Sequence, residues 1–234
     1  MFGYYGYGFM LLCLLISGIA QMGVNSAFSR YSRIQSYRGM TASQVARMIL
    51  DRNHLSHIRI EVAAGNLTDH YDPRACTVRL SQNVYNNTSV AAIGVAAHEC
   101  GHAIQHAEEY KPLVLRNAIV KSTNICSNLS FILIAVGFLI TAFIQAGSPI
   151  SAILIDLGIL AFSVTTFFQL ITLPVEFNAS RRALVAIESN QILSQEEQKG
   201  AKKVLKAAAM TYVAALVVSL LQLLRLIAMF RRRD

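Results

Sequence analysis

The fold class of this chain follows from residues 129–173, which read LSFILIAVGFLITAFIQAGSPISAILIDLGILAFSVTTFFQLITL. The stretch contains two apolar runs, at about 129–146 and 150–173. Each run is close to the ~20 residues that an α-helix needs to cross the hydrocarbon core of a bilayer. Gly147, Ser148 and Pro149 lie between the runs and interrupt helical structure. The pattern therefore predicts two membrane-spanning helices joined by a tight turn.

Two further apolar segments lie near the ends of the chain, at about 4–24 and 207–230. The second is interrupted by Gln222 and Arg225. The first lacks the basic start and the small-residue cleavage site of a secretory signal, so we expect it to remain as an anchor. Together the four segments predict about four transmembrane helices.

The composition agrees with a membrane protein. Hydrophobic residues make up 54% of the 234 residues, charged residues only 15%, and the mean hydropathy is +0.43. So much apolar surface excludes intrinsic disorder as the main state, and its concentration in runs disfavours a soluble globule. The formal net charge is +8, but the aromatic residues lie mainly in apolar runs. This favours contact with an anionic membrane surface, and no nucleic-acid partner is expected.

The predicted organisation has five parts. An N-terminal transmembrane anchor at 1–24 precedes a polar region at 25–128. A transmembrane hairpin at 129–173 is followed by a polar helical segment at 174–206, and by a C-terminal transmembrane helix with a basic tail at 207–234. Four spans place both polar parts on one side of the membrane. Lys and Arg flank the spans mostly on that side, which predicts that it is cytoplasmic, although Arg231–Arg233 argue for the opposite orientation.

Short helices and strands are expected in the polar region. Thr41 with Gln44 predicts a capped helix, and a helical pattern recurs over about 89–109. Between them, residues 57–81 alternate and contain turn residues, which predicts two or three short strands.

Two pieces of this strand region have specific interpretations. Asp72-Pro73-Arg74 is interpreted as a turn that stabilises the sheet. The segment TVRLSQNVY, residues 77–85, is interpreted as an edge strand on which an extended peptide could pair.

Chemistry is indicated by residues 98–102, His-Glu-Cys-Gly-His. Residues four apart share a helix face, so His98 and His102 can bind one Zn²⁺ while Glu99 stands beside a water-filled position. Zinc lowers the pKa of its water toward ~7 and polarises a carbonyl, and Glu99 is the expected general base. Cys100 points to another face and is interpreted as a packing residue. The alternative is a pair of histidines that pack without a metal.

A third ligand has to come from elsewhere in the chain. Glu176, in the segment LPVEFNASRRAL at 173–184, lies on the same predicted membrane side as His98. Asp156 is the rival, since a carboxylate inside an apolar span is costly and marks function by default. Asp156 is about 27 Å along a helix from the polar boundary, which favours Glu176.

Three more residues are candidates to act near the metal. His106 lies eight residues after His98 and does not fit the spacing of a third metzincin histidine, so it is interpreted as a residue of the helix face or of the surroundings of the ligands and not as a ligand; the alternative is that it contacts the site as an oxyanion or proton-transfer group. Arg181 and Arg182 are candidates to bind a substrate carboxylate or an oxyanion, or to contact lipid headgroups.

The segments HYDPR at 70–74, VRLSQNVYNNTSVAAIGVAAHECGHAIQH at 78–106 and LPVEFNASRRAL at 173–184 carry a family resemblance over almost the whole chain. The sequence resembles the YugP-type family of neutral zinc metallopeptidases of bacterial membranes. That family is similar to the HtpX and CAAX-prenyl endopeptidase group of membrane gluzincins, where a helix reading E-F-x-A-D supplies the third ligand from its Glu. The resemblance implies that Zn²⁺ is the cofactor and Glu176 a ligand. The Asp position of that helix is Ser180 here, so Ser180 or Asn178 is expected to hydrogen-bond a zinc-bound histidine in its place.

The expected fold is a mainly α membrane protein of about four transmembrane helices, with a small α+β zincin-like catalytic region between the first and second spans. The expected function is a membrane-bound zinc-dependent endopeptidase in the bacterial plasma (inner) membrane, with its catalytic side cytoplasmic. Its expected partners are the lipid bilayer, a protein or peptide substrate, and a membrane-protein partner. The alternatives are a non-catalytic zinc-containing membrane scaffold or assembly factor, and a transporter that uses Asp156 and Arg225.

Overall fold

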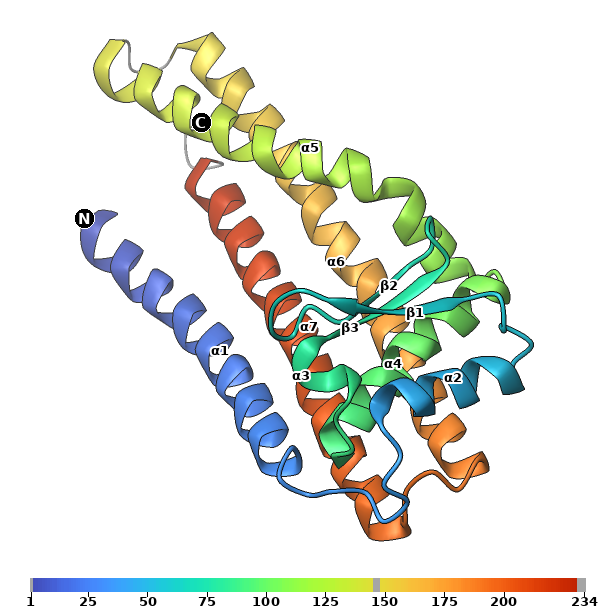
Figure 1. The fold of residues 1–234 in the computed structure, drawn as a ribbon. Helices are drawn as coiled ribbons and strands as arrows, with labels where there is room; N and C mark the ends of the chain where they lie inside the picture. Colours follow the sequence, from blue (N-terminus) through green and yellow to red (C-terminus); the bar gives the residue numbers. More distant parts are fainter. Residues whose placement is uncertain (1, 145–147, 231–234) are drawn as a thin grey trace. The chain divides into compact units, whose positions relative to one another are not determined.

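The computed structural model describes residues 2–144 and 148–230 of the chain (Figure 1). Gly147, part of the expected turn between the second and third spans, lies outside the described residues, as does the basic tail at 231–234. The chain divides into two compact units. The first comprises residues 1–113 and 174–211, and the second comprises residues 114–173 and 212–234.

Within residues 2–144 and 148–230, four helices are long and apolar enough to cross a membrane. They are α1 (Phe2–Tyr31), α5 (Lys111–Leu139), α6 (Pro149–Ser189) and α7 (Gln195–Phe230), and a π-helical turn, η1 (Ile140–Ile144), extends α5. With a small three-stranded sheet between α1 and α5, they confirm a mainly α membrane protein.

Helix α6 continues well beyond its apolar run. It passes through Pro174 and ends at Ser189. A proline inside a helix removes one backbone hydrogen bond, and such a loss is tolerated when neighbouring contacts compensate for it. The result is that Glu176 follows the apolar run on the same continuous helix.

The first unit contains the short elements. Helix α2 (Ala42–Arg52) begins at the predicted capping box, in which the Thr41 side chain accepts from Gln44 N–H and the Gln44 side chain accepts from Thr41 N–H. Strands β1 (Arg59–Ala63), β2 (His70–Asp72) and β3 (Thr77–Ser81) form the sheet, and α3 (Gln82–Tyr85) and α4 (Val90–Ala107) follow. These elements confirm the short strands and the second helix expected in the polar region.

Strand β3 is the central strand, so its interpretation as an edge strand is wrong. The sheet order is β1-β3-β2, with β1 parallel and β2 antiparallel to β3. Moreover, the chain after Ser81 leaves the sheet as helix α3. Alternation reports which face of a strand is buried, but it carries no information about which strands pair on either side.

Helix α4 is the centre of the first unit. Its residues Ile93, Ala96, Ala97 and Cys100 are fully buried in the hydrophobic core, which α2 and β3 also line. Ser89 caps the helix by accepting from Ala92 N–H at 3.3 Å. Because almost every turn of α4 is packed, the side chains that it presents are held in fixed directions.

The second unit contains close helix contacts at glycine. A Cβ at Gly137 would lie 2.7 Å from Ile155 Cγ1, and one at Gly158 would lie 2.5 Å from Ile134 Cγ1. Small residues that allow such approach are the usual means of helix packing in a bilayer. The same unit has a buried hydrogen bond between Thr166 and Ser219, at 2.7 Å between their hydroxyl oxygens.

Candidate metal centre

Helix α4 presents two histidines on one face, as their spacing predicts. The rings of His98 and His102 meet edge to face, with centroids 4.7 Å apart. Their side chains are only 17% and 13% exposed. Two imidazoles that share a partly buried face can bind the same metal ion.

Glu176 of α6 completes a three-residue cluster. Its Oε2 atom lies 3.3 Å from His98 Nε2 and 3.6 Å from His102 Nε2, and the three ligand atoms are within 4.8 Å of one another. Ligands at about 2.1 Å from a tetrahedral Zn²⁺ lie roughly 3.4 Å apart, so this donor set fits zinc with a fourth position left for water.

Asp156 has no part in this cluster. Within the described residues, His98, His102 and Glu176 are the only group of three His, Cys, Asp or Glu side chains with metal-binding spacing. Asp156 is an exposed residue of α6 in the second unit.

The position of Glu176 depends on a glycine in the histidine motif. A Cβ at Gly101 would lie 2.5 Å from the Ala179 carbonyl oxygen and 3.2 Å from Ala179 Cα. Helices α4 and α6 therefore touch through their backbones between the two histidines. Any larger residue at 101 would separate the helix that carries His98 and His102 from the helix that carries Glu176.

Glu99 is adjacent to the cluster in sequence and is only 8% exposed. None of the described residues forms a hydrogen bond with its carboxylate, so its oxygens are available to a water molecule. Cys100 points into the core, where its thiol contacts Ala46 O at 3.6 Å and burial raises its pKa. A protonated, buried thiol is not a metal ligand, which agrees with a packing role for Cys100.

The second ring nitrogen of each histidine has its own partner. Ser180 Oγ lies 3.2 Å from His98 Nδ1, and Gln105 Oε1 lies 3.0 Å from His102 Nδ1. Burial lowers the pKa of His102, but the hydrogen bond to Glu176 and the charges of Glu99 and Glu176 outweigh burial and raise it. The negative charges of Glu99 and Glu176 also favour the binding of a doubly charged metal ion at this place.

Sequence reasoning missed Gln105. It is fully buried and also donates to Val175 O and Asn178 Oδ1 of α6, at 2.8 and 2.9 Å. One signal was available, because Gln105 is a polar residue three positions after His102, about one turn further along a largely apolar helix. Among the described residues, the hydrogen bonds of the Asn178 side chain are to Gln105 and Arg182, and the ring nitrogens of the two histidines bond to Ser180 and Gln105 instead.

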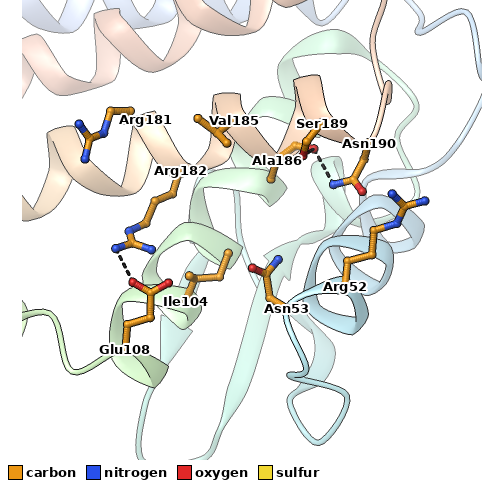
Figure 2. Close-up of a pocket in the computed structure, with 10 residues that line it drawn as sticks. All are labelled: Arg52, Asn53, Ile104, Glu108, Arg181, Arg182, Val185, Ala186, Ser189 and Asn190. Atoms are coloured by element: carbon orange, nitrogen blue, oxygen red, sulfur yellow. Dashed lines mark hydrogen bonds and ion pairs between the residues drawn. The ribbon is translucent and has the colours of Figure 1, made fainter.

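Arg182 belongs to the same set of contacts. It donates to Asn178 Oδ1 at 2.7 Å and forms a 2.7 Å ion pair with Glu108. Hydrogen bonding by Arg182 lowers the pKa of Glu108. Figure 2 shows Arg182 reaching to Glu108, whereas Arg181 points away from that pair. Both arginines line a cavity of about 610 Å³ between the ends of α2, α4 and α6.

His106 lies on α4 one turn beyond His102 and is exposed. Its Nδ1 atom is 2.9 Å from the Tyr71 hydroxyl of β2. Burial, with the nearby Cys76 and Asp72, raises the pKa of Tyr71 to about 12, so the phenol stays protonated and can donate. The pair joins the edge strand β2 to α4.

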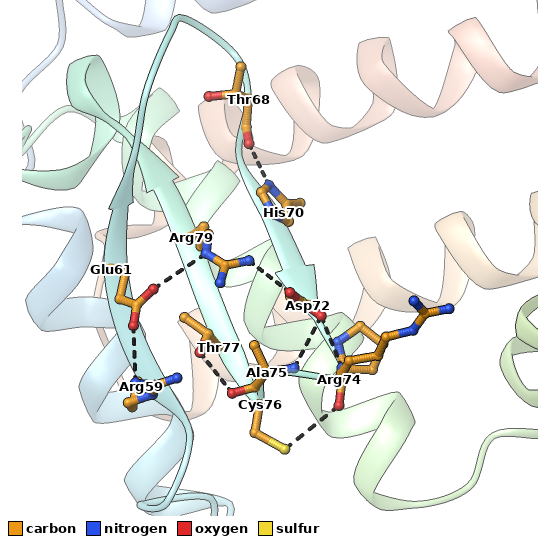
Figure 3. A network of polar contacts seen from close by, with 11 residues as sticks. Arg59, Glu61, Thr68, His70, Asp72, Arg74, Ala75, Cys76, Thr77 and Arg79 are labelled. Carbon is orange, nitrogen blue, oxygen red and sulfur yellow. Dashed lines mark hydrogen bonds and ion pairs between the residues drawn. The ribbon is translucent and has the colours of Figure 1, made fainter.

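The turn after β2 has the structural role expected of it. Asp72 accepts from the backbone N–H groups of Arg74 and Ala75 and pairs with Arg79 of β3 at 2.8 Å (Figure 3). Arg79 also pairs with Glu61 of β1 at 3.4 Å, so one arginine spans all three strands.

Comparisons with known proteins agree with a metal centre. The model of a family described as "Putative neutral zinc metallopeptidase" matches residues 7–231. A protein of Bacillus subtilis (strain 168) described as "Putative membrane protease YugP" is 46% identical over 225 residues, which cover 95% of this chain and 96% of that protein. No solved structure matches the chain.

Proposed function

The chain belongs to the zinc metallopeptidase family whose model covers residues 7–231, and we propose that it is a membrane-bound zinc-dependent endopeptidase. The observation that carries the proposal is the cluster of His98, His102 and Glu176. A buried His₂Glu set with a carboxylate beside it is the arrangement of a catalytic zinc site, whereas a structural site is closed by a fourth protein ligand.

His98, His102 and Glu176 would hold the metal. Bound Zn²⁺ supplies a Lewis acid for the scissile carbonyl and a lowered pKa for the attacking water. The ligands come from two helices in backbone contact at Gly101, so the protein supplies a rigid arrangement that does not reorganise during the reaction.

Glu99 is the general base in this proposal. Its carboxylate takes a proton from water as the water oxygen bonds to the carbonyl carbon. It then delivers that proton to the leaving nitrogen as the C–N bond breaks. The low exposure of Glu99, 8%, limits competing solvent around that transfer.

The proposed substrates are membrane-associated proteins or peptides, because the four apolar helices would keep the enzyme in the bilayer. The proposed location is the bacterial plasma membrane, with the catalytic side cytoplasmic.

Arg182, with its partners Asn178 and Glu108, is better placed to support the site than to bind an oxyanion. Within the described part of the chain His106 forms its hydrogen bond through Nδ1 alone, so its Nε2 is the atom proposed for proton transfer.

Zinc content and peptide cleavage test the proposal together. We expect one zinc per chain and cleavage of a casein-type substrate by the detergent-solubilised protein. Glu99→Gln should keep zinc and lose cleavage, because the amide is not a base. Glu176→Ala should lose both, and the matched control Asp156→Ala should keep both.

Other results would contradict specific parts of the proposal. Full zinc content in Glu176→Ala would remove Glu176 from the ligand set. Cleavage by Glu99→Gln would remove the general base. Bound zinc without cleavage of any substrate by the unmodified protein would favour the non-catalytic scaffold.

A further inference from the structure

Gln105 is a buried polar group that a packing role does not explain. Its side chain lies on α4 with no exposed surface. Burying an amide costs free energy unless its donors and acceptor are all satisfied. Gln105 meets that condition with three contacts, to His102, Val175 and Asn178.

The direction of each hydrogen bond follows from Arg182. A guanidinium has donors only, so the Asn178 atom that faces Arg182 Nε at 2.7 Å is the oxygen. The same oxygen faces Gln105 at 2.9 Å, so the Gln105 atom there is the NH₂ nitrogen. The Gln105 oxygen must therefore face His102.

A second contact leads to the same orientation independently. The Gln105 nitrogen also lies 2.8 Å from Val175 O, and a backbone carbonyl only accepts. Both hydrogens of the amide are used, one on each acceptor. Rotating the amide by half a turn would place its oxygen against two acceptors, so this orientation is fixed.

The proton of His102 is then fixed as well. Gln105 Oε1 accepts at 3.0 Å, so His102 Nδ1 carries a hydrogen, and in the neutral imidazole Nε2 is then the nitrogen with the lone pair. Nε2 is the nitrogen that lies toward Glu176, at 3.6 Å from Oε2. His98 differs, because the Ser180 hydroxyl can donate or accept and imposes no such choice.

We propose that Gln105 is a positioning residue that selects the metal-binding tautomer of His102, with Asn178 and Arg182 holding the Gln105 amide in its orientation. The inference rests on the proposed function, since it assumes that His102 binds zinc through Nε2. It assigns a role in the zinc site to Gln105, and it gives Asn178 and Arg182 an indirect role. Glu108 anchors the far end of the chain of contacts through its 2.7 Å ion pair with Arg182.

The first test compares two Gln→Leu variants of the full-length protein in detergent. Gln105→Leu removes the acceptor of His102. Gln198→Leu is the control, because Gln198 of α7 also donates a side-chain hydrogen bond to a backbone carbonyl, Leu193 O, at 3.0 Å. Loss of a partner of a metal-bound histidine costs ~10- to 100-fold in metal affinity, so we expect zinc binding to weaken by that factor only in Gln105→Leu. Zinc affinity is measured by chelator competition.

The second test uses a conservative pair at residue 178. Asn178→Asp keeps an acceptor oxygen for both Gln105 and Arg182, so zinc binding should be no weaker than in the unmodified protein. Asn178→Leu leaves one amide hydrogen of Gln105 without an acceptor and Val175 O as the remaining contact that orients the amide, so the amide is held less firmly and zinc binding should weaken. The ligand-field absorption of the Co²⁺-substituted protein gives a readout that general destabilisation does not move. We expect this spectrum to change in Gln105→Leu and Asn178→Leu and to stay unchanged in Gln198→Leu and Asn178→Asp.

The outcomes separate this inference from the proposed function. Unchanged zinc affinity and cobalt spectrum in Gln105→Leu would overturn the inference alone, as would equal weakening by Asn178→Asp and Asn178→Leu. Failure of the unmodified protein to bind zinc would overturn the proposed function and the inference with it. Circular dichroism melting of the metal-free variants identifies any loss of fold, and the pair at residue 178 decides the inference if Gln105→Leu does not fold.

Discussion

At the scale of single residues, the two histidines of the cluster differ in their outer partners. His102 faces the amide oxygen of Gln105, whose nitrogen donates to Val175 O and Asn178 Oδ1, and Asn178 accepts in turn from Arg182. Among the described residues, His98 Nδ1 has the hydroxyl of Ser180 as its partner, at 3.2 Å. The outer contact of His98 is therefore neutral and weaker than a charged one.

We expect Ser180→Ala to weaken zinc binding about fivefold, since the net contribution of a neutral hydrogen bond is about 1 kcal/mol. Chelator competition measures the change. Ser189→Ala is the control, because the Ser189 hydroxyl donates to Ala186 O within the same helix. An equal effect of the two substitutions would show that the 3.2 Å contact between Ser180 and His98 contributes nothing to the site.

At the scale of elements, the packing of α4 on α6 sets the ligand geometry. The contact is made by the backbone of Ala179 against Gly101, in the middle of the histidine motif. By contrast, a Cβ at Gly94 of the same helix would lie 3.5 Å from the nearest atom, Ala201 Cβ, which is an ordinary contact distance.

Gly101→Ala should therefore destabilise the protein and weaken zinc binding, whereas Gly94→Ala should not. Overpacking of this kind costs ~1–3 kcal/mol, while alanine in a helix that accommodates it gains up to ~1 kcal/mol over glycine. Thermal unfolding followed by circular dichroism, with zinc content of the folded protein, measures both effects. If Gly101→Ala had the same melting temperature as the unmodified protein, α4 and α6 could move apart without loss of stability, which would contradict this prediction.

The sheet depends on a charge at the β2–β3 turn. The pKa of Asp72 is held below its usual value, mainly by the hydrogen bond from Arg79 and also by the Ala75 and Arg74 amides. A carboxyl with a lowered folded pKa contributes stability above its unfolded pKa of about 3.9, and this contribution is lost as the pH falls through the folded value.

Asp72→Asn should consequently be less stable than the unmodified protein at pH 7, and the difference should shrink below about pH 4. Melting temperatures at a series of pH values test this. Asp51→Asn is the control, because Asp51 pairs with Arg47 on the exposed surface of α2 and should give a smaller change. A difference that stays constant down to pH 3 would refute the role of the Asp72 charge.

At the scale of the whole molecule, four candidate spans are combined with a compact unit that holds the metal cluster. Basic residues follow the apolar runs of α1 and α6 and precede that of α7. An excess of Lys and Arg beside spans marks the cytoplasmic side of a membrane.

We expect a cysteine at position 202 to react only from the cytoplasmic side. Lys202 is an exposed residue of the polar part of α7, and Cys13, Cys76, Cys100 and Cys126 would first be replaced. A membrane-impermeant maleimide should label Lys202→Cys in inverted vesicles and leave it unlabelled in intact cells. Labelling in intact cells would place the metal cluster on the outer side.

Local patterns in the sequence were enough for the spans and for the pair of histidines. Apolar runs of membrane-spanning length became helices because a bilayer admits few other structures. His98 and His102 came together because residues four apart share a helix face. The capping box at Thr41 and the turn at Asp72 are equally local, and both formed as expected.

Only the tertiary structure decided which distant residues meet. Ser180 contacts His98 across 82 residues, and Gln105 reaches Asn178 across 73. The central place of β3 depends likewise on the pairing of strands on both sides. Periodicity within a helix or strand specifies which face is buried, but it does not specify the partner of that face. The backbone contact at Gly101 sets that partner for α4, and through it the position of Glu176 beside the two histidines.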